Sequence, residues 1–389
     1  MNRLILMLIF GLSLVLTACN KDENPASPSE PQGELYSVGD IKIPVLKGDG
    51  NRMGRQLGNL MRSEIRELYD LMVESRLRSH RFTYDELLRE ADLYWDTVIP
   101  PWMKALCDGL SMTGGLTLDQ IKILQLMDII LLNREACSGI IAWEYYTDGG
   151  CLLIGHNLDN EEAVSYAHLL CVTVFKFTDS GRQFAVFGYP GIFSVNSGVN
   201  DAGLCVTMNA APMADVFTAR DLSRPWRRLM SFEWLMTCES LDMLRIAYLD
   251  APVALGCNYL AADVGNGTCF ETALDVILER NPDEDGLICE TNHFIHHLLQ
   301  EHNRAYFGDN TGTSSHLRWN NLVAILRDHK GAWTMSRLMD QVLQVPEDQG
   351  GVMNGSVVSF VFRPLDLTLL IGSPYAIEPV FIDLNNYFD

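Results

Sequence analysis

Apolar residues recur at steps of three and four through the first third of the chain, a spacing that is typical of amphipathic helices. The sequence Thr117-Leu-Asp-Gln120 has the form of a capping box ahead of an apolar run. One short edge strand is expected before the helices, over residues 35–46. Helices are expected over 51–78, 83–97, 101–112 and 117–132. The chain before residue 137 is therefore predicted to be mostly helical.

After residue 136 the pattern changes to short apolar runs that are separated by Gly, Asp and Asn, which indicates strands and turns. Strands are expected over 137–142, 151–157, 168–177, 183–188, 193–198, 203–209, 256–263, 267–275, 356–363 and 367–372. Helices are expected over 224–237, 240–249, 315–328 and 334–345. Runs of strands and helical blocks in one chain predict the α+β class, with two sheets between helical layers.

The first 18 residues have the features of a secretory signal: a basic start, a short apolar run and small residues before Cys19. Leu16-Thr-Ala-Cys19 looks like a bacterial lipobox, which predicts lipidation of Cys19; a plain signal peptide with a chance cysteine is the alternative. Asn20 argues against retention in an inner membrane, and the acidic run that follows resembles a surface-export tag. We therefore expect an exported protein, lipid-anchored to the outer membrane on its periplasmic or cell-surface side.

Residues 19–34 are polar and contain three prolines, so they are expected to form a disordered tether behind the lipidated cysteine. No second linker of this kind occurs in the remaining chain, which favours one large domain. The formal net charge of −21 disfavours nucleic acid as a partner. No Cys-x-x-Cys pair is present, which excludes a zinc ribbon or a thioredoxin-like motif. Nine cysteines besides Cys19 leave at least one free thiol.

A set of short polar motifs follows an internal cysteine. The motifs are Glu135-Ala136-Cys137-Ser138, Gly155-His156-Asn157-Leu158-Asp159, Asn200-Asp-Ala-Gly-Leu-Cys-Val-Thr-Met-Asn209, Thr291-Asn292-His293-Phe294 and Ser314-Ser315-His316-Leu317-Arg318. In this order the set resembles the N-terminal-nucleophile (Ntn) hydrolases of the isopenicillin N acyltransferase type, and more distantly the choloylglycine (bile-salt) hydrolases. The early Gly54-Arg-Gln-Leu-Gly58 segment and the closing Asn354-Gly-Ser-Val-Val-Ser359 strand are part of the same resemblance.

The resemblance implies that the chain cuts itself between Ala136 and Cys137. A thiol needs a base to become a good nucleophile, and a free α-amine has a reference pKa of about 7.7–8.0. Cleavage would place that base on the nucleophile itself. The expected fold is a four-layer αββα sandwich, with residues 35–136 as a helical pro-region or α chain and 137–389 as the β chain that carries the catalytic core. The pro-region would block the site or stay as a separate packed chain.

The resemblance also implies roles for residues downstream of the nucleophile. Asp159 would hold and orient the α-amine, and Asn209 would donate to the oxyanion of the tetrahedral intermediate. Asn292 corresponds to a second active-site asparagine close to the nucleophile. Arg318 would lower the pKa of the thiol or hold a carboxylate in place. The alternative for each is a structural role: a solvated Asp at a strand end, Asn at turns or caps, and an Arg on a helix surface.

Two positions depart from these families. The bile-salt hydrolases carry Arg where this chain has His156, so bile-salt specificity is not implied. His156 and Asn157 are both interpreted as residues of the substrate pocket. Ala136 stands where the acyltransferases carry Gly.

Three histidines, His293, His296 and His297, have a spacing that metal ligands on a helix can have. No His-Glu-x-x-His motif and no third acidic ligand at a set spacing accompanies them, so no metal is expected. No P-loop, dinucleotide fingerprint or Gly-x-Ser-x-Gly elbow is present, and no cofactor is expected.

The sequence thus predicts an exported hydrolase that acts on linear amide bonds of small N-acyl compounds through a thioester on Cys137. An acyltransferase that passes the acyl group to an amine is the first alternative, and a non-catalytic, lipid-anchored binding protein on the same fold is the second. N-acyl amino acids, bile-acid amides, penicillin V-like side chains and acyl lactones all remain open as substrates.

Overall fold

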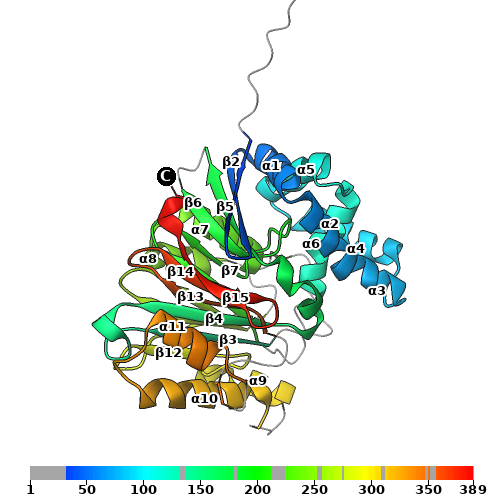
Figure 1. Ribbon diagram of the computed structural model, residues 1–389. Coiled ribbons are helices and arrows are strands. Elements are labelled where there is room, and N and C mark those ends of the chain that lie inside the picture. Colours follow the sequence, from blue (N-terminus) through cyan, green and yellow to red (C-terminus); the bar gives the residue numbers. More distant parts are fainter. Residues whose placement is uncertain are drawn as a thin grey trace, which may run out of the picture. The chain divides into compact units, whose positions relative to one another are not determined.

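A computed structural model (Figure 1) gives the fold of most of the chain. It describes residues 32–131, 136–178, 182–211, 224–225, 227–251, 256–273, 276–307, 312–346, 349–350 and 356–388. The predicted signal segment, Cys19 and nearly all of the predicted tether lie outside these ranges. Within the ranges, no helix combines the length and the apolar character that crossing a membrane requires.

The helices before residue 137 form largely where the apolar spacing predicts them. They are α1 (Gly50–Leu60), α2 (Arg62–Tyr69), α3 (Ser75–Arg78), α4 (Tyr84–Thr97), α5 (Pro101–Thr113) and α6 (Leu118–Leu131). The single helix expected over 51–78 is interrupted at Met61 and again by a π-helical turn, Asp70–Glu74. Thr117 and Gln120 exchange the two hydrogen bonds of a capping box, as expected at the start of α6.

The strands form two sheets. The nine-stranded sheet has the order β1-β2-β5-β6-β7-β8-β9-β10-β11, and the six-stranded sheet has the order β12-β3-β4-β13-β14-β15. The strands of the first are β1 (Glu34–Val38), β2 (Ile41–Gly48), β5 (Cys171–Phe177), β6 (Gln183–Gly188), β7 (Ser197–Asn200), β8 (Cys205–Ala210), β9 (Cys257–Ala262), β10 (Gly267–Ala273) and β11 (Val276–Arg280). Those of the second are β3 (Ala136–Ala142), β4 (Leu153–Asp159), β12 (Leu287–Glu290), β13 (Ser356–Arg363), β14 (Thr368–Ser373) and β15 (Ile377–Asp383).

The prediction of one edge strand over 35–46 is wrong in an informative way. The segment is a hairpin, in which β1 forms the sheet edge and β2 lies inside the nine-stranded sheet. β2 pairs in parallel with β5, from Lys42 opposite Cys171 to Gly48 opposite Phe177. Side chains on both of its faces, such as Ile43 and Leu46, are fully buried. The N-terminal segment therefore contributes to the central sheet itself.

Helices cover the outer face of each sheet, which gives four layers (Figure 1). On the nine-stranded sheet, α7 (Arg227–Thr237) packs on β6, β7 and β8, and α8 (Leu241–Leu249) follows it. On the six-stranded sheet, α10 (Ser314–Asp328) packs on β12 and β3, and α11 (Met335–Leu338) packs on β13. The sheets contact each other through β3 and β4 on one side and β8 and β9 on the other. The αββα architecture is confirmed.

The sequence analysis missed β11, β12, β15 and the helix α9 (Gln300–Phe307). β12 has only four residues, and the alternation of buried and exposed positions in β11 and β15 is weak. In such segments strand pairing contributes more than the local pattern: β12 pairs with the distant strand β3, whereas β11 and β15 pair with β10 and β14, the strands directly before them.

The expected Gly54-x-x-x-Gly58 motif is explained by a close helix crossing. A Cβ at Gly54 would lie 2.0 Å from Leu106 O, and one at Gly109 would lie 1.9 Å from Asn51 O. The backbones of α1 and α5 therefore touch at this crossing, and only glycine fits there.

Substitution of Gly54 by alanine is expected to lower the free energy of unfolding by about 3 kcal/mol, the upper end of the usual cost of overpacking. Gly188→Ala is the matched control because its Cβ would meet nothing within 4 Å. That change should alter stability by less than about 1 kcal/mol. Urea unfolding of both variants checks the prediction, and equal effects would argue against a backbone contact between α1 and α5.

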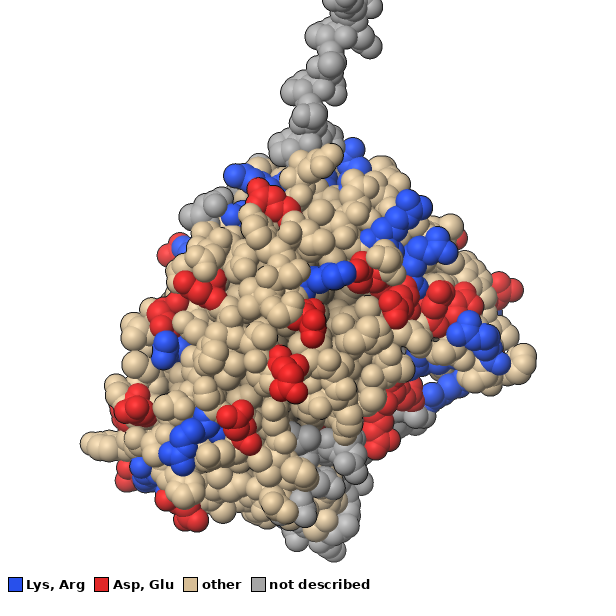
Figure 2. Space-filling model, in the orientation of Figure 1, with Lys and Arg blue, Asp and Glu red and all other residues tan. Residues whose placement is uncertain are grey.

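The surface charges are mixed on the face that Figure 2 shows. Acidic and basic side chains lie interspersed on the described part of this face, with no gathering of one sign. Several charged side chains of the described residues are paired, for example Arg363 with Asp366 and Lys330 with Asp285. Such exposed pairs contribute little to stability.

Candidate active site

Cys137 is the second residue of β3, and its side chain is fully buried. β3 lies between β4 and β12 in the six-stranded sheet. Because Ala136 pairs with Asp159 on the antiparallel strand β4, the end of β4 returns this aspartate to the start of β3. On the other side, Glu290 of β12 pairs with Gly139, so the chain leaving β12 reaches the level of Cys137 two residues later. Two strand pairings thus bring distant motifs to the cysteine.

Asn292 follows β12 and contacts the backbone of Cys137. Its Oδ1 accepts the Cys137 N–H at 2.7 Å, and its Nδ2 donates to Ala210 O at 2.8 Å. Its own backbone N–H donates to Ser315 Oγ at 2.9 Å. The carboxamide is therefore fixed at both ends, with its oxygen directed at the nitrogen of Cys137.

Arg318 is the centre of the polar cluster. It lies in the second turn of α10, and its side chain is 1% exposed. Nη1 donates to Cys137 O and, at 2.6 Å, to Ser138 Oγ, while Nη2 donates to Asn292 Oδ1 at 2.9 Å. Nη1 also lies 3.9 Å from Asp159 Oδ2. The planar fork of arginine suits this arrangement, because one side chain reaches several acceptors at fixed angles.

Asp159 is buried beside Arg318 at the end of β4. Its Oδ1 accepts a hydrogen bond from the hydroxyl of Ser356, which begins β13 and pairs directly with Asp159 in the sheet. A buried carboxylate needs an opposite charge and hydrogen bonds to remain ionised. The guanidinium and the hydroxyl supply both.

Asn209 lies on β8, in the opposite sheet, and joins the site through a second set of contacts. Its Oδ1 is 2.7 Å from His156 Nε2, and its Nδ2 donates to Thr291 O at 3.3 Å. Asn258 Nδ2 donates to the same carbonyl at 2.9 Å. Because Thr291 precedes Asn292, the two sets of contacts meet in one segment. The structure thus joins Cys137, Asp159, Asn292 and Arg318 directly, and links Asn209 to them through residue 291.

His156 and Asn157 are both fully buried but face opposite sides of β4, as neighbours on a strand do. His156 points towards the other sheet and Asn209. Asn157 Nδ2 donates to Leu343 O in the outer helical layer, at 2.8 Å. The interpretation of Asn157 as a pocket residue is therefore not supported by its position, which ties β4 to the helices.

The three histidines of the 293–297 segment do not converge. His293 Nδ1 lies 2.8 Å from Ser315 Oγ and its ring stacks on His316. The rings of His296 and His297 stack on each other, and the segment before residue 297 is not helical. Within the described ranges, no cluster of three or more His, Cys, Asp or Glu is arranged to hold a metal ion.

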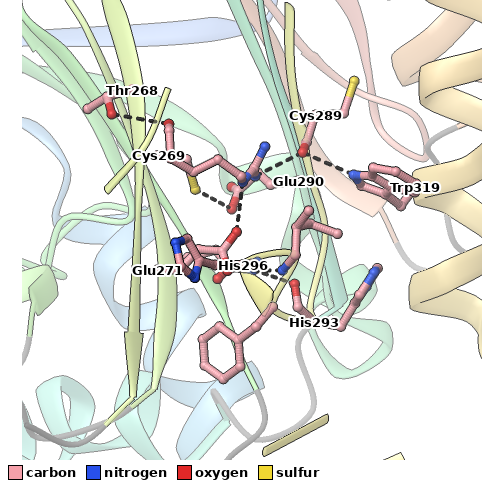
Figure 3. Close-up of polar contacts among 12 residues, drawn as sticks. Thr268, Cys269, Glu271, Cys289, Glu290, His293, His296 and Trp319 are labelled. Carbon is pink, nitrogen blue, oxygen red and sulfur yellow. Dashed lines mark hydrogen bonds and ion pairs between the residues drawn. The ribbon is translucent and has the colours of Figure 1, made fainter. Parts of the chain in front are cut away.

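Charged side chains in the interior form hydrogen bonds with the backbone of the segment that carries Asn292 (Figure 3). Glu271 Oε1 accepts from Arg280 Nε at 2.7 Å, and its Oε2 accepts the N–H groups of residues 295–296 at 2.9 and 2.8 Å. Arg280 Nη2 donates to Cys289 O at 3.0 Å. The ion pair therefore holds the backbone on both sides of Asn292.

Glu290 lies in the same interior and accepts a hydrogen bond from Cys269 Sγ. Burial raises the pKa of its carboxyl well above the ordinary value of 4.5, although Arg280 opposes this shift. The folded state therefore favours the protonated carboxyl.

Glu290→Gln is expected to make stability less dependent on pH. The folded state binds the Glu290 proton more tightly than the unfolded state, so this group stabilises the fold fully below pH 4.5. That contribution is lost as the pH rises through the raised pKa. Melting temperatures measured between pH 4 and 9 should show the variant gaining on the wild type as pH rises, and a difference that stays constant with pH would contradict the prediction.

The family model described as "Acyl-coenzyme A:6-aminopenicillanic acid acyl-transferase" matches residues 146–371, more than half of the chain. The chain belongs to this acyl-transferase family. It is therefore an enzyme of the acyl-transferase type, in agreement with the family resemblance that the sequence motifs carry.

The match to the acyl-transferase family includes Asp159, Asn209, Asn292 and Arg318, and it begins after Cys137. A search of curated proteins found no match.

Several solved structures are similar at low identity. An N-acylethanolamine-hydrolyzing acid amidase orthologue from Caenorhabditis elegans is 14% identical, covering 59% of this chain and 93% of its own, with a TM-score of 0.44. Penicillin V acylase from Agrobacterium tumefaciens is 10% identical, covering 64% and 86%, with a TM-score of 0.44. A variant of the conjugated bile acid hydrolase from Clostridium perfringens is 11% identical, covering 64% and 93%, with a TM-score of 0.40.

Sequence reasoning missed the hydroxyl groups that complete the site of this acyl-transferase family member. They are Ser138, Thr291, Ser315 and Ser356. All four lie inside the segments that carry the family resemblance. A single sequence does not distinguish a serine that serves a buried arginine from one on the surface, so the adjacency to Cys137, Asn292 and Arg318 was the only available signal.

Proposed function

We propose that this protein is an exported amide hydrolase whose nucleophile is Cys137, released as an N-terminal residue by cleavage after Ala136. The observation that supports this best is the set of contacts around the Cys137 backbone. Its N–H is bound by Asn292 and its carbonyl by Arg318, both through buried side chains. A strand residue with a purely structural role needs no hydrogen bonds from side chains to its backbone, because the neighbouring strands already bond its N–H and C=O groups.

Cleavage would consume one water and convert the Cys137 amide into an α-amine. The amine would keep Asn292 Oδ1 as its acceptor, 2.7 Å from the nitrogen before cleavage. It would take the proton of the thiol, directly or through one water, and leave a thiolate. The carboxylate of Asp159 at the end of the paired strand would favour the protonated amine that results.

The thiolate would then attack the carbonyl carbon of an N-acyl compound and form a tetrahedral intermediate. Asn209 Nδ2 would donate to its oxyanion, which is the largest electrostatic contribution in reactions of this kind. Collapse of the intermediate, with a proton from the α-amine, releases the amine product and leaves a thioester on Cys137. Water attacks the thioester, releases the carboxylic acid and restores the thiol.

Acyl transfer is the second candidate, and the description of the matched family favours it. The same thioester would pass its acyl group to an amine instead of water. Product analysis with water and a primary amine in competition separates the two outcomes.

We also propose that residues 1–18 are removed and that Cys19 is lipidated, which would anchor the enzyme to the outer membrane on its periplasmic or cell-surface side. The support is the sequence pattern before Cys19 alone. Metabolic labelling with a fatty acid, beside a Cys19→Ser variant, tests this part without affecting the rest. Label on the variant would contradict it.

The main test is intact mass spectrometry of a soluble form that begins at residue 20, followed by a screen of N-acyl amino acids, bile-acid amides and penicillin V. We expect two chains that separate between Ala136 and Cys137, and an acyl adduct on the chain that begins with Cys137. An intact chain with an unreactive cysteine would instead favour a non-catalytic, lipid-anchored binding protein.

A further inference from the structure

The geometry points to His156 as a positioning residue that fixes the carboxamide of Asn209 for oxyanion binding. This inference rests on the proposed function, because it assigns His156 to the reaction proposed for Cys137. It replaces the interpretation of His156 as a residue of the substrate pocket.

The hydrogen bond between the two side chains has one consistent set of donors and acceptors. Asn209 has its nitrogen 3.3 Å from Thr291 O, and a carbonyl oxygen only accepts. The other end of the carboxamide is therefore the oxygen, 2.7 Å from His156 Nε2. A carboxamide oxygen also only accepts, so the imidazole must carry its proton on Nε2. The tautomer thus follows from the position of Thr291.

The environment keeps His156 neutral in that tautomer. The ring is fully buried, with the ring of Phe360 5.9 Å away between the centroids. Burial, reinforced by the positive charge of Arg228, lowers the pKa of His156 to about 3. The ring therefore donates through Nε2 across the whole working pH range. Nδ1 makes no hydrogen bond to any described residue.

A fixed donor at this place determines what Asn209 can do. A free carboxamide can turn by half a rotation and exchange its oxygen and nitrogen. With the oxygen held by His156, the nitrogen stays on the side of Thr291. Its NH₂ group has two hydrogens, one of which goes to Thr291 O, so the second is available to an oxyanion. Without His156, the exchanged orientation would present an acceptor to the developing negative charge.

The kinetic test is a double-mutant cycle in the soluble form, with His156→Leu, Asn209→Ala and the two combined. We expect His156→Leu to lower kcat on the order of 10–100-fold with little change in KM, less than the roughly 10²–10³-fold loss for a removed oxyanion donor. In the Asn209→Ala background the second change should cost nothing further. His156→Gln should recover part of the rate, because its side-chain N–H can donate to the same oxygen. Additive losses would overturn the inference.

A spectroscopic measurement of the His156 ring tests the inference without requiring turnover of any substrate. In protein labelled with ¹⁵N-histidine, we expect His156 to show a neutral ring with the proton on Nε2, and this signal should shift in Asn209→Ala. Asn258→Ala is the matched control: it removes the neighbouring donor to Thr291 O but leaves the acceptor of His156 in place. A proton on Nδ1, or equal shifts in both variants, would overturn the inference even in an active enzyme. If no amide is turned over, the proposed function fails, and these spectra still decide the role of His156.

Discussion

Replacing Cys137 by alanine is expected to abolish both cleavage of the chain and hydrolysis of amides. One sulfur atom serves both reactions in the proposed mechanism, so no intermediate phenotype is expected. Removing a nucleophile that works as a unit with its base lowers kcat on the order of 10⁶-fold. Intact mass should show a single chain, and turnover should fall to the background of the assay.

The control for this change is Cys107→Ala. Cys107 is also fully buried, but it lies on α5, among the helices that precede residue 137. Its loss removes a small apolar group and should affect stability alone. A Cys137→Ala protein that is still cut would assign the cleavage to another residue or to a protease, and one that still turns over amides would refute the mechanism.

The second large effect is expected at Arg318, where methionine should cost both stability and activity. Removing the guanidinium leaves the Asp159 carboxylate buried without its opposite charge, and loss of one partner of a buried pair costs about 3–5 kcal/mol. The same change releases the carbonyl of Cys137 and the carboxamide of Asn292. Urea unfolding measures the loss of stability, and amide turnover measures the loss of activity.

Two further variants show whether the loss comes from the buried charge. Arg327→Met lies on the same helix but removes an exposed pair with Asp283, and it should cost less than about 1 kcal/mol. Adding Asp159→Asn to Arg318→Met removes the unpaired charge and should recover part of the stability. If Arg318→Met costs no more than Arg327→Met, the ion pair does not stabilise the fold.

The sequence predicted most elements whose patterns are long or strongly periodic. The helices at 83–97 and 101–112 and the strands around Cys137 and Asp159 lie within a few residues of their expected positions. Prediction was wrong where distant pairing decides the outcome, as in β2, whose parallel partner β5 lies well over a hundred residues further along the chain. A helix-breaking π turn at Asp70–Glu74 likewise has no distinct composition.

The same distinction applies to the site. Motifs ordered along the chain identified Cys137, Asn292 and Arg318, which the fold brings into contact. They gave no indication that Asn157 faces the outer helices. Both faces of β4 are buried, so the sequence alone does not tell which face packs on the other sheet and which packs on the helices. Nor did the motifs reveal that the partner of His156 would be Asn209, which belongs to the opposite sheet.

The insertion of β2 has a consequence for any molecule cut before Cys137. One sheet would then be built from two polypeptides, because β1 and β2 come from the first and β5 onward from the second. The first polypeptide could not leave without exposing the unpaired edge of β5, and such an edge invites aggregation. The mature enzyme would therefore be an obligate heterodimer. After denaturation its recovery would be a bimolecular process that depends on protein concentration, whereas the uncut precursor would refold at a rate independent of it.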